Sequence, residues 1–276
     1  MENRESNRRS FIRKIVGIAA FGGLAGLLFG QKSEKVSAAG AANQIAYYTA
    51  PDTLTGSNHL RWYNTDRNFV AGYSGNTVTS GAVGATISGG GTSGLTNRVT
   101  DSYGTVGGGL KNLAGDNDAT VTNATYATVG GGWGNTASGQ FAAVGGGEIN
   151  QASSTCATVG GGHYNTASGD RATVGGGYWN MASGYVATVP GGCDNVAAGY
   201  YSFAAGRRAK IAATHDGTFL FADQSNYNFN SSAANEFAVR ATGGARFVTA
   251  IDPGTGNPTK TIVMTPAGNL GVGTPT

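Results

Sequence analysis

The sequence is poor in charged residues. Only 12% of its 276 residues are Asp, Glu, Lys or Arg, against about 25% in ordinary soluble domains. That share is too low for a highly charged disordered tail and is unlike that of a helical enzyme. Residues 1–40 carry a net charge of +4 (seven Lys/Arg, three Asp/Glu), whereas residues 41–276 carry −1 (eleven and twelve). Because the body of the chain lacks a basic field, we expect no nucleic-acid partner.

Motifs for catalysis and metal binding are also missing. The three histidines (His59, His163 and His215) are isolated, and no His-Glu-x-x-His, Gly-x-Ser-x-Gly or Cys-x-x-Cys motif is present. Asp116 and Asp118 offer carboxylates for Ca²⁺, but oxygen ligands at this density are common in turns. We therefore expect no catalytic residue, no cofactor and no metal.

What the sequence does contain is glycine, 48 residues of it, arranged in a repeat rather than in the Gly-X-Y rhythm of collagen. The stretch TVGGGHYNTASGDRATVGGGYWNMASG contains almost two copies of the repeat unit. Several columns recur every 15 residues. The two clearest columns are Val129, Val144, Val159, Val174 and Val189, and Asn135, Asn150, Asn165, Asn180 and Asn195.

A 15-residue unit is too short for the helix pairs of helical repeats, which need 33 residues or more. It has room for two short strands and two turns. Ala127-Thr128-Val129 alternates as a half-buried strand does, with Thr facing out, and Gly-Gly-Gly and Ser-Gly are turn signals. Each copy is therefore predicted to be one coil of a solenoid, and the stacked Asn side chains are expected to face inward and bond along the stack.

The predicted fold class is all-β: a parallel β-roll or β-solenoid with 15-residue coils and small β caps at both ends. One step of the repeat is eight residues longer, and the extra residues, within 114–125, are expected to form a loop. About eight coils are expected. The predicted segments are a signal peptide (1–39), an N-terminal β cap (40–74), the solenoid (75–214), a C-terminal β segment (215–250) and a Gly/Pro/Thr-rich tail (251–276).

The predicted core is thin, because each coil buries little more than two Ala and one Val. Further burial between chains, by association about a rotation axis, is therefore expected. Cys156 and Cys193 occupy different columns and would lie about 10 Å apart along the stack, too far for a disulfide. They are expected to be small buried or half-buried residues, and a bridge between chains stays open.

The N-terminus predicts export. Arg8-Arg9-Ser10-Phe11-Ile12-Arg13-Lys14 resembles a twin-arginine signal and precedes a 15-residue apolar run. That run is shorter than the ~20 residues of a membrane span. Val36-Ser37-Ala38 is a candidate cleavage site, and an uncleaved anchor is the alternative. We expect an extracellular or cell-surface protein with no membrane span after signal removal.

Aromatic residues gather in the variable columns at the turns, where a core this thin has no room for them. They are expected to face solvent or another subunit, and either subunit packing or ligand recognition would explain them. These candidate contact residues are Trp133, His163, Tyr164, Tyr178, Trp179, Tyr126, Phe141, Tyr185, Tyr200 and Tyr201.

The unit A-T-V-G-G-G-x-x-N-x-A-S-G resembles the head repeats of trimeric autotransporter adhesins, over about half of the chain. The segment Phe203–Lys210 is similar to the way such heads end, and Gly268–Thr274 resembles a linker of phage tail-fibre-like proteins. The resemblance implies a left-handed parallel β-roll assembled as a homotrimer.

The expected function is thus a non-enzymatic exported protein for attachment or for cell-surface or fibre assembly, with a glycan or surface protein as possible ligand. A β-solenoid lyase or hydrolase acting on polysaccharide is the alternative. Ice binding through the Thr128, Thr158, Thr173 and Thr188 column is a third reading, weakened by Ala143, which interrupts the column.

Overall fold

The structure is a computed structural model that describes residues 28–29, 34–35, 44–50, 53–268 and 270–273. No helix occurs among these residues, so none of the described segments is an apolar helix of membrane-spanning length. Almost all of the predicted signal peptide lies outside the described ranges. Only the paired strands β1 (Leu28–Phe29) and β2 (Glu34–Lys35) are described there.

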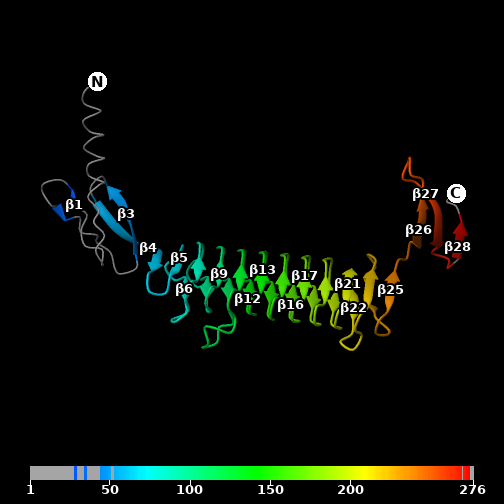
Figure 1. The fold of residues 1–276 in the computed structure, drawn as a ribbon, viewed down its shortest axis with the longest axis horizontal. Coiled ribbons are helices and arrows are strands. Elements are labelled where there is room, and N and C mark those ends of the chain that lie inside the picture. The colour runs from blue at the N-terminus through cyan, green and yellow to red at the C-terminus, as the bar shows by residue number, and fades with distance from the viewer. Residues whose placement is uncertain (1–27, 30–33, 36–43, 51–52, 269, 274–276) are drawn as a thin grey trace, which may run out of the picture.

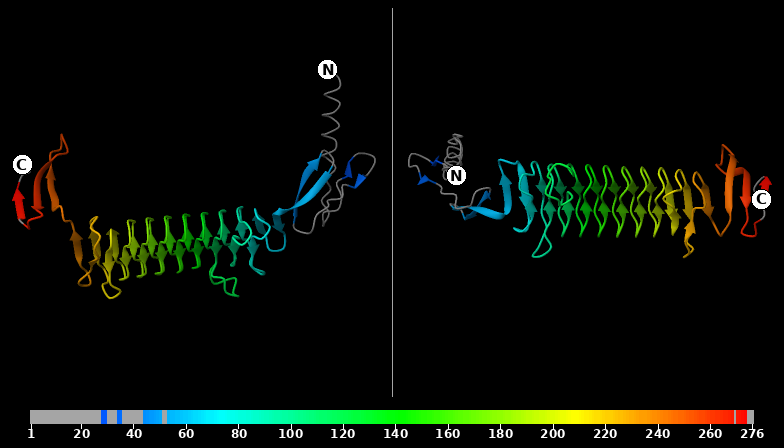
Figure 2. Two further views of the ribbon diagram at one scale, coloured as in Figure 1. Left: turned by 180° about the vertical axis from the view of Figure 1, so that it is seen from behind. Right: turned by 90° about the horizontal axis from the view of Figure 1, so that it is seen from below.

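Most of the described chain is a slender rod of stacked coils (Figure 1, Figure 2). Each coil contributes one strand to each of two facing sheets. We call the larger one the valine sheet, after the residue that most of its strands bury. Its 13 described strands are β3 (Gln44–Ala50), β4 (Thr53–Tyr63), β5 (Asn68–Ala71), β7 (Thr86–Ile87), β9 (Thr105–Val106), β11 (Thr128–Val129), β13 (Ala143–Val144), β15 (Thr158–Val159), β17 (Thr173–Val174), β19 (Thr188–Val189), β21 (Phe203–Gly206), β23 (Phe219–Ala222) and β25 (Phe237–Arg240).

The facing sheet, which we call the alanine sheet, has ten strands in the described chain. They are β6 (Thr77–Val78), β8 (Arg98–Val99), β10 (Leu113–Ala114), β12 (Thr136–Ala137), β14 (Gln151–Ala152), β16 (Thr166–Ala167), β18 (Met181–Ala182), β20 (Val196–Ala197), β22 (Ala209–Ile211) and β24 (Phe229–Asn230).

Successive coils pair in parallel and in the predicted register. Val144 of β13 lies opposite Val159 of β15, and Ala152 of β14 lies opposite Ala167 of β16. The all-β parallel solenoid with 15-residue coils is therefore confirmed. Its regularity follows from the strand period of two, because a slip by one residue would turn every buried Val or Ala outward.

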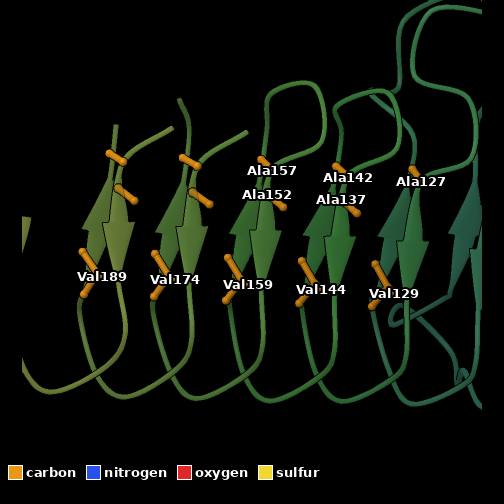
Figure 3. Close-up of a cluster of buried hydrophobic side chains, with 14 of the residues drawn as sticks. Ala127, Val129, Ala137, Ala142, Val144, Ala152, Ala157, Val159, Val174 and Val189 are labelled. Carbon is orange, nitrogen blue, oxygen red and sulfur yellow. The ribbon is translucent and has the colours of Figure 1, made fainter. Parts of the chain in front are cut away.

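The core is a thin double file of small side chains. Within a coil, an Ala and the Val two residues later point inward from the valine sheet, and one Ala points inward from the alanine sheet (Figure 3). Val159, Ala157 and Ala167, for example, are fully buried. In the regular coils the inward positions of the two sheets hold only Ala and Val, whereas the larger Ile87, Ile211 and Leu220 are buried nearer the ends of the rod.

The Asn column completes the interior at the turn that follows the valine sheet. Asn165 is fully buried, and its Nδ2 donates to the carbonyl oxygens of Gly161 (2.9 Å) and Gly177 (2.8 Å). Its Oδ1 accepts from the backbone N–H of Asn180 in the next coil (3.0 Å). Asn135, Asn150, Asn180 and Asn195 repeat this pattern, so the column satisfies turn groups that would otherwise be buried without partners.

Glycine is required beside that column. Gly162 has φ +87°, and a Cβ there would lie 2.2 Å from the carbonyl oxygen of Gly177 in the next coil. The position thus combines a left-handed backbone with a close approach between coils, and only glycine meets both demands.

The rod extends beyond the regular repeat. Parallel pairing continues from β21 to β23 and from β23 to β25, although these steps are 16 and 18 residues long. In the described chain, eleven strands from β5 to β25 run parallel in the valine sheet, more than the eight coils expected. The expected loop is present between β10 and β11.

Antiparallel strands flank the rod in the sequence at both ends. β4 pairs with β3 and with β5 at the N-terminal end. After β25, a separate sheet is formed by β26 (Ala245–Ile251), β27 (Pro258–Met264) and β28 (Leu270–Gly273). The predicted N-terminal cap is therefore present. Residues 215–250, predicted as a C-terminal β segment, mostly continue the rod, and two of the three strands of the antiparallel sheet lie in the predicted tail.

Candidate functional site

Each coil has two turns, and the turns line two long edges of the rod. We call edge 1 the row of turns that lead from the valine sheet to the alanine sheet. Edge 2 is the row that leads back, seen between Ala137 and Ala142 at the top of Figure 3, with edge 1 at the bottom. The two edges therefore lie on opposite sides of the stack.

The ten aromatic and histidine residues singled out from the sequence all lie on these edges, in two separate groups. Trp133, His163, Tyr164, Tyr178 and Trp179 lie on edge 1. Tyr126, Phe141, Tyr185, Tyr200 and Tyr201 lie on edge 2. None of the ten is buried, and most are exposed.

Many of the edge residues have a left-handed backbone, which the sequence did not reveal. In the described chain, one column on each edge has φ between 52° and 64° at non-glycine residues. These are Lys111, Ile149, Tyr164, Trp179, Asp194 and Arg208 on edge 1, and Tyr103, Tyr126, Phe141, Cys156, Arg171, Val186 and Tyr201 on edge 2.

A hydrogen bond between coils explains this backbone. The N–H of Tyr164 donates to the carbonyl of Glu148 in the preceding coil (3.0 Å), and the N–H of Phe141 donates likewise to Thr125 (2.9 Å). The left-handed conformation turns the N–H along the stack. The fold therefore imposes the conformation, whatever residue stands there.

The fold does not, however, require a bulky side chain at these positions. Glycine stands in the same columns at Gly134 on edge 1 (φ 66°) and at Gly84 and Gly217 on edge 2 (φ 67° and 65°). A left-handed backbone costs a non-glycine residue roughly 1–2 kcal/mol, and most in β-branched residues such as Ile149. Side chains at such positions point to a role outside the backbone of the coil.

Edge 2 carries a regular ladder of rings. The rings of Tyr103 and Tyr126 stack at 4.9 Å with 7° between planes, and those of Tyr126 and Phe141 at 5.0 Å with 3°. Further along, Tyr185 packs edge-on against Tyr200 and Tyr201. Rings thus form two runs on this edge, separated by the coils that carry Cys156 and Arg171.

Edge 1 instead carries one compact group in two adjacent coils, His163, Tyr164, Tyr178 and Trp179, which we call the edge 1 cluster. The rings of Tyr178 and Trp179 are nearly parallel (10°, 5.4 Å), whereas Tyr164 meets Trp179 edge-on (78°, 6.2 Å). His163 contacts both tyrosines, at 4.3 and 5.4 Å between centroids. Trp179 remains 54% exposed and Tyr164 42%.

Few charges surround the edge 1 cluster. Glu148 lies 3.6 Å from Nε2 of His163, and both side chains are well exposed. Asp194, one coil beyond Trp179, is already engaged by Arg208 (3.1 Å) and Lys210 (2.7 Å). The cluster therefore offers rings and hydrogen-bonding groups rather than a net charge.

The carboxylates of the loop between β10 and β11 are held by the loop itself. The amide of Asn123 donates to Asp116 (2.7 Å) and to Asp118 (2.8 Å). The backbone N–H of Thr120 is the main cause of the lowered pKa of Asp118. Nowhere in the described residues do three or more His, Cys, Asp or Glu side chains gather to hold a metal ion.

Two further features departed from the sequence analysis or were missed by it. The expectation that both cysteines are buried or half-buried is wrong for Cys156, which is exposed because its left-handed turn points the side chain outward; Cys193 is half-buried. The stack of Phe203, Phe219 and Phe237 on the outer face of the valine sheet was also missed, although each Phe stands in the column that Thr occupies upstream.

The fold defines an all-β repeat protein, a parallel β-solenoid with two side-chain-bearing edges. The sequence matches no protein-family model, and none of the curated proteins is significantly similar to it.

Proposed function

We propose that this chain is a non-enzymatic exported protein whose rod serves in attachment at a cell surface or in a fibre. The observation that carries the proposal is the display of exposed side chains along both edges at positions where the backbone favours glycine. The N-terminal sequence supports export, and the repeat supports likeness to the heads of trimeric autotransporter adhesins.

In this proposal edge 2 packs against other copies of the chain. Its rings form two runs along the rod, Tyr103 to Phe141 and Tyr185 to Tyr201, so a second rod of the same repeat would meet aromatic surface at both stretches. Each coil buries only two Ala and one Val, so burial of exposed rings such as Phe141 and Tyr201 would add stability. A homotrimer about an axis parallel to the rod is the assembly that the resemblance favours.

Light scattering on the mature chain tests the assembly. We expect three times the mass of one chain at micromolar concentration. Tyr126→Arg together with Phe141→Arg should release monomers, because it places two charges in the contact. Thr136→Arg, on the outer face of the alanine sheet, is the matched control and should leave the mass unchanged. A monomeric wild-type chain would remove the trimer from the proposal.

An array of glycans and matrix proteins tests attachment. We expect retention of the trimer on at least one surface component, without any change in that component. Release of sugars from a polysaccharide would instead favour the alternative, a solenoid enzyme acting on polysaccharide, and would overturn the proposal.

A further inference from the structure

We propose that the edge 1 cluster is a binding site for an uncharged polysaccharide, whose sugar rings pack against Trp179, Tyr178 and Tyr164. This inference rests on the proposed function, since it names the ligand of an attachment protein.

The geometry of the rings is the first reason. Tyr178 and Trp179 stack on one another with nearly parallel rings, and Tyr164, edge-on to Trp179, forms a wall beside this pair. The result is a shallow corner of aromatic surface. A pyranose ring has an apolar face of C–H groups and a rim of hydroxyl groups, so it can lie on such a surface while its rim stays in water.

The polar atoms of the cluster are the second reason. Tyrosine hydroxyls, the indole N–H and the imidazole each combine an apolar body with a hydrogen-bonding tip, which suits a ligand that alternates C–H faces and hydroxyls. Recognition sites of this kind are mostly aromatic, with a few polar groups that fix orientation.

The charge around the cluster selects an uncharged ligand. Within the cluster there is no Lys or Arg, and the neighbouring Glu148 lies beside His163. Nucleic acids and acidic polysaccharides need cationic partners for their phosphates, sulfates or carboxylates, and Glu148 would repel them. A neutral glycan needs no cationic partner and is not repelled by Glu148.

The size of the cluster argues against a protein partner or a second copy of the chain. Rings bury about 150–250 Å² each when fully covered, so half-exposed side chains in two coils offer on the order of 400 Å². A stable protein interface needs about 800 Å² from each partner. The cluster is also confined to two coils, whereas a contact between parallel rods would recur along the edge.

The direction of the site follows from the solenoid. Tyr164 and Trp179 lie in adjacent coils, one strand spacing apart, so the aromatic corner extends along the rod axis. An extended glycan would therefore lie along edge 1, with about one sugar unit per coil, and would pass over Glu148 and Ile149 on one side.

Affinity electrophoresis and calorimetry of the full mature protein test the site, with xylan, mannan, mixed-linkage β-glucan and chitin oligosaccharides as probes and heparin as a charged comparator. We expect at least one neutral probe to bind and heparin not to bind. Trp179→Ala and Tyr164→Ala should each weaken that binding about tenfold or more. Trp133→Ala, on the same edge but outside the cluster, should change it less than twofold.

Thermal melting and light scattering of the same variants distinguish a loss of glycan binding from unfolding or loss of the oligomer. Both substituted side chains are exposed, so Trp179→Ala should melt within a few degrees of wild type and remain oligomeric. Loss of the oligomer in Trp179→Ala would show that the cluster is a subunit contact and would overturn the proposal. Failure of every neutral glycan to bind, or binding that Trp179→Ala does not change, would also overturn it.

The two proposals fail differently. If the trimer is retained on a matrix protein but on no glycan, the polysaccharide site falls and attachment stands. If no surface component retains it, both fall.

Discussion

At the scale of single residues, the coil is held by what Asn and Gly do and not by the size of its core. Asn165 and its equivalents give turn carbonyls and N–H groups their partners inside the stack. The outward residues of the same strands, such as Thr166, have no such task. Position in the coil, more than residue type, therefore decides the effect of a substitution.

Asn165→Leu is expected to destabilise the protein by roughly 3 kcal/mol or more. It leaves the carbonyl of Gly161 and the N–H of Asn180 without partners, and it removes one of the two hydrogen bonds to the carbonyl of Gly177. Thr166→Leu, one residue later and facing outward, should stay within about 0.5 kcal/mol of wild type. Thermal or denaturant unfolding measures both. Equal melting temperatures would contradict the inward assignment of the Asn column.

Ile149→Asn is expected to stabilise the protein by about 1 kcal/mol. Ile149 is β-branched with φ 52°, and Asn tolerates a left-handed backbone at a lower cost. The matched change Val196→Asn, in a strand of the alanine sheet, should destabilise, since Asn is unfavourable there. A lower melting temperature for Ile149→Asn than for wild type would show that its turn is not strained.

At the scale of elements, each coil contacts only its neighbours, and this makes the coil a removable unit. Strand β15, for example, pairs with β13 and β17. The stability of such an array is a sum over coils and their contacts. Changes at one rung should therefore be local, provided that the register is kept.

Deletion of residues 142–156 removes one whole coil and joins Phe141 to Ala157, which stands at the equivalent point of the next coil. We expect a folded protein with an unchanged far-ultraviolet spectrum and a melting temperature only a few degrees lower. Deletion of residues 142–149 removes about half a coil and should prevent normal folding of the coils that follow the deletion. Similar losses in the two variants would argue against a 15-residue coil.

The last coils depend on the carboxylate of Asp223. The backbone N–H of Thr242 donates to it (2.8 Å) and is the main cause of its strongly lowered pKa; Ser225 also donates to it, and Arg240 Nε pairs with it (3.0 Å). Since the folded state lowers the pKa, the stabilisation is fully present above the unfolded value of about 3.9 and is lost as the pH falls through the folded value.

Asp223→Asn should therefore melt at a lower temperature than wild type at pH 7, and the difference should shrink as the pH falls below about 4. Melting curves of both proteins between about pH 2 and 7 measure this. Curves that stay equally far apart down to pH 2 would show that the Asp223 carboxylate does not carry the effect.

At the scale of the whole molecule, the sequence predicted the structure where one residue pattern repeats. It did not predict the structure where contacts between coils determine the backbone conformation. The inward faces of Val144 and Asn165 could be predicted because period and alternation are local properties. The left-handed turns at Tyr164 and Phe141 could not, since hydrogen bonds to the preceding coil impose them against the preference of the residues.

The extent of the rod was underestimated for a similar reason. After Ile211 the repeat motif ends and the steps lengthen, but backbone pairing in β23 and β25 needs no particular side chain and continues. Similarly, the sequence placed aromatic residues at turns, but only the structure separates a ladder along edge 2 from a compact cluster on edge 1.

Distances between pairs of spin labels test whether the chain rises by one strand spacing with each coil. In a chain with Cys156 and Cys193 replaced by Ser, diluted with unlabelled chain, one label stands at position 188 and the other at 128, 105 or 86. These pairs are four, five and six coils apart in the valine sheet. We expect the distance to grow from about 19 Å by about 4.8 Å with each added coil. Distances that do not increase steadily with the number of coils would contradict it.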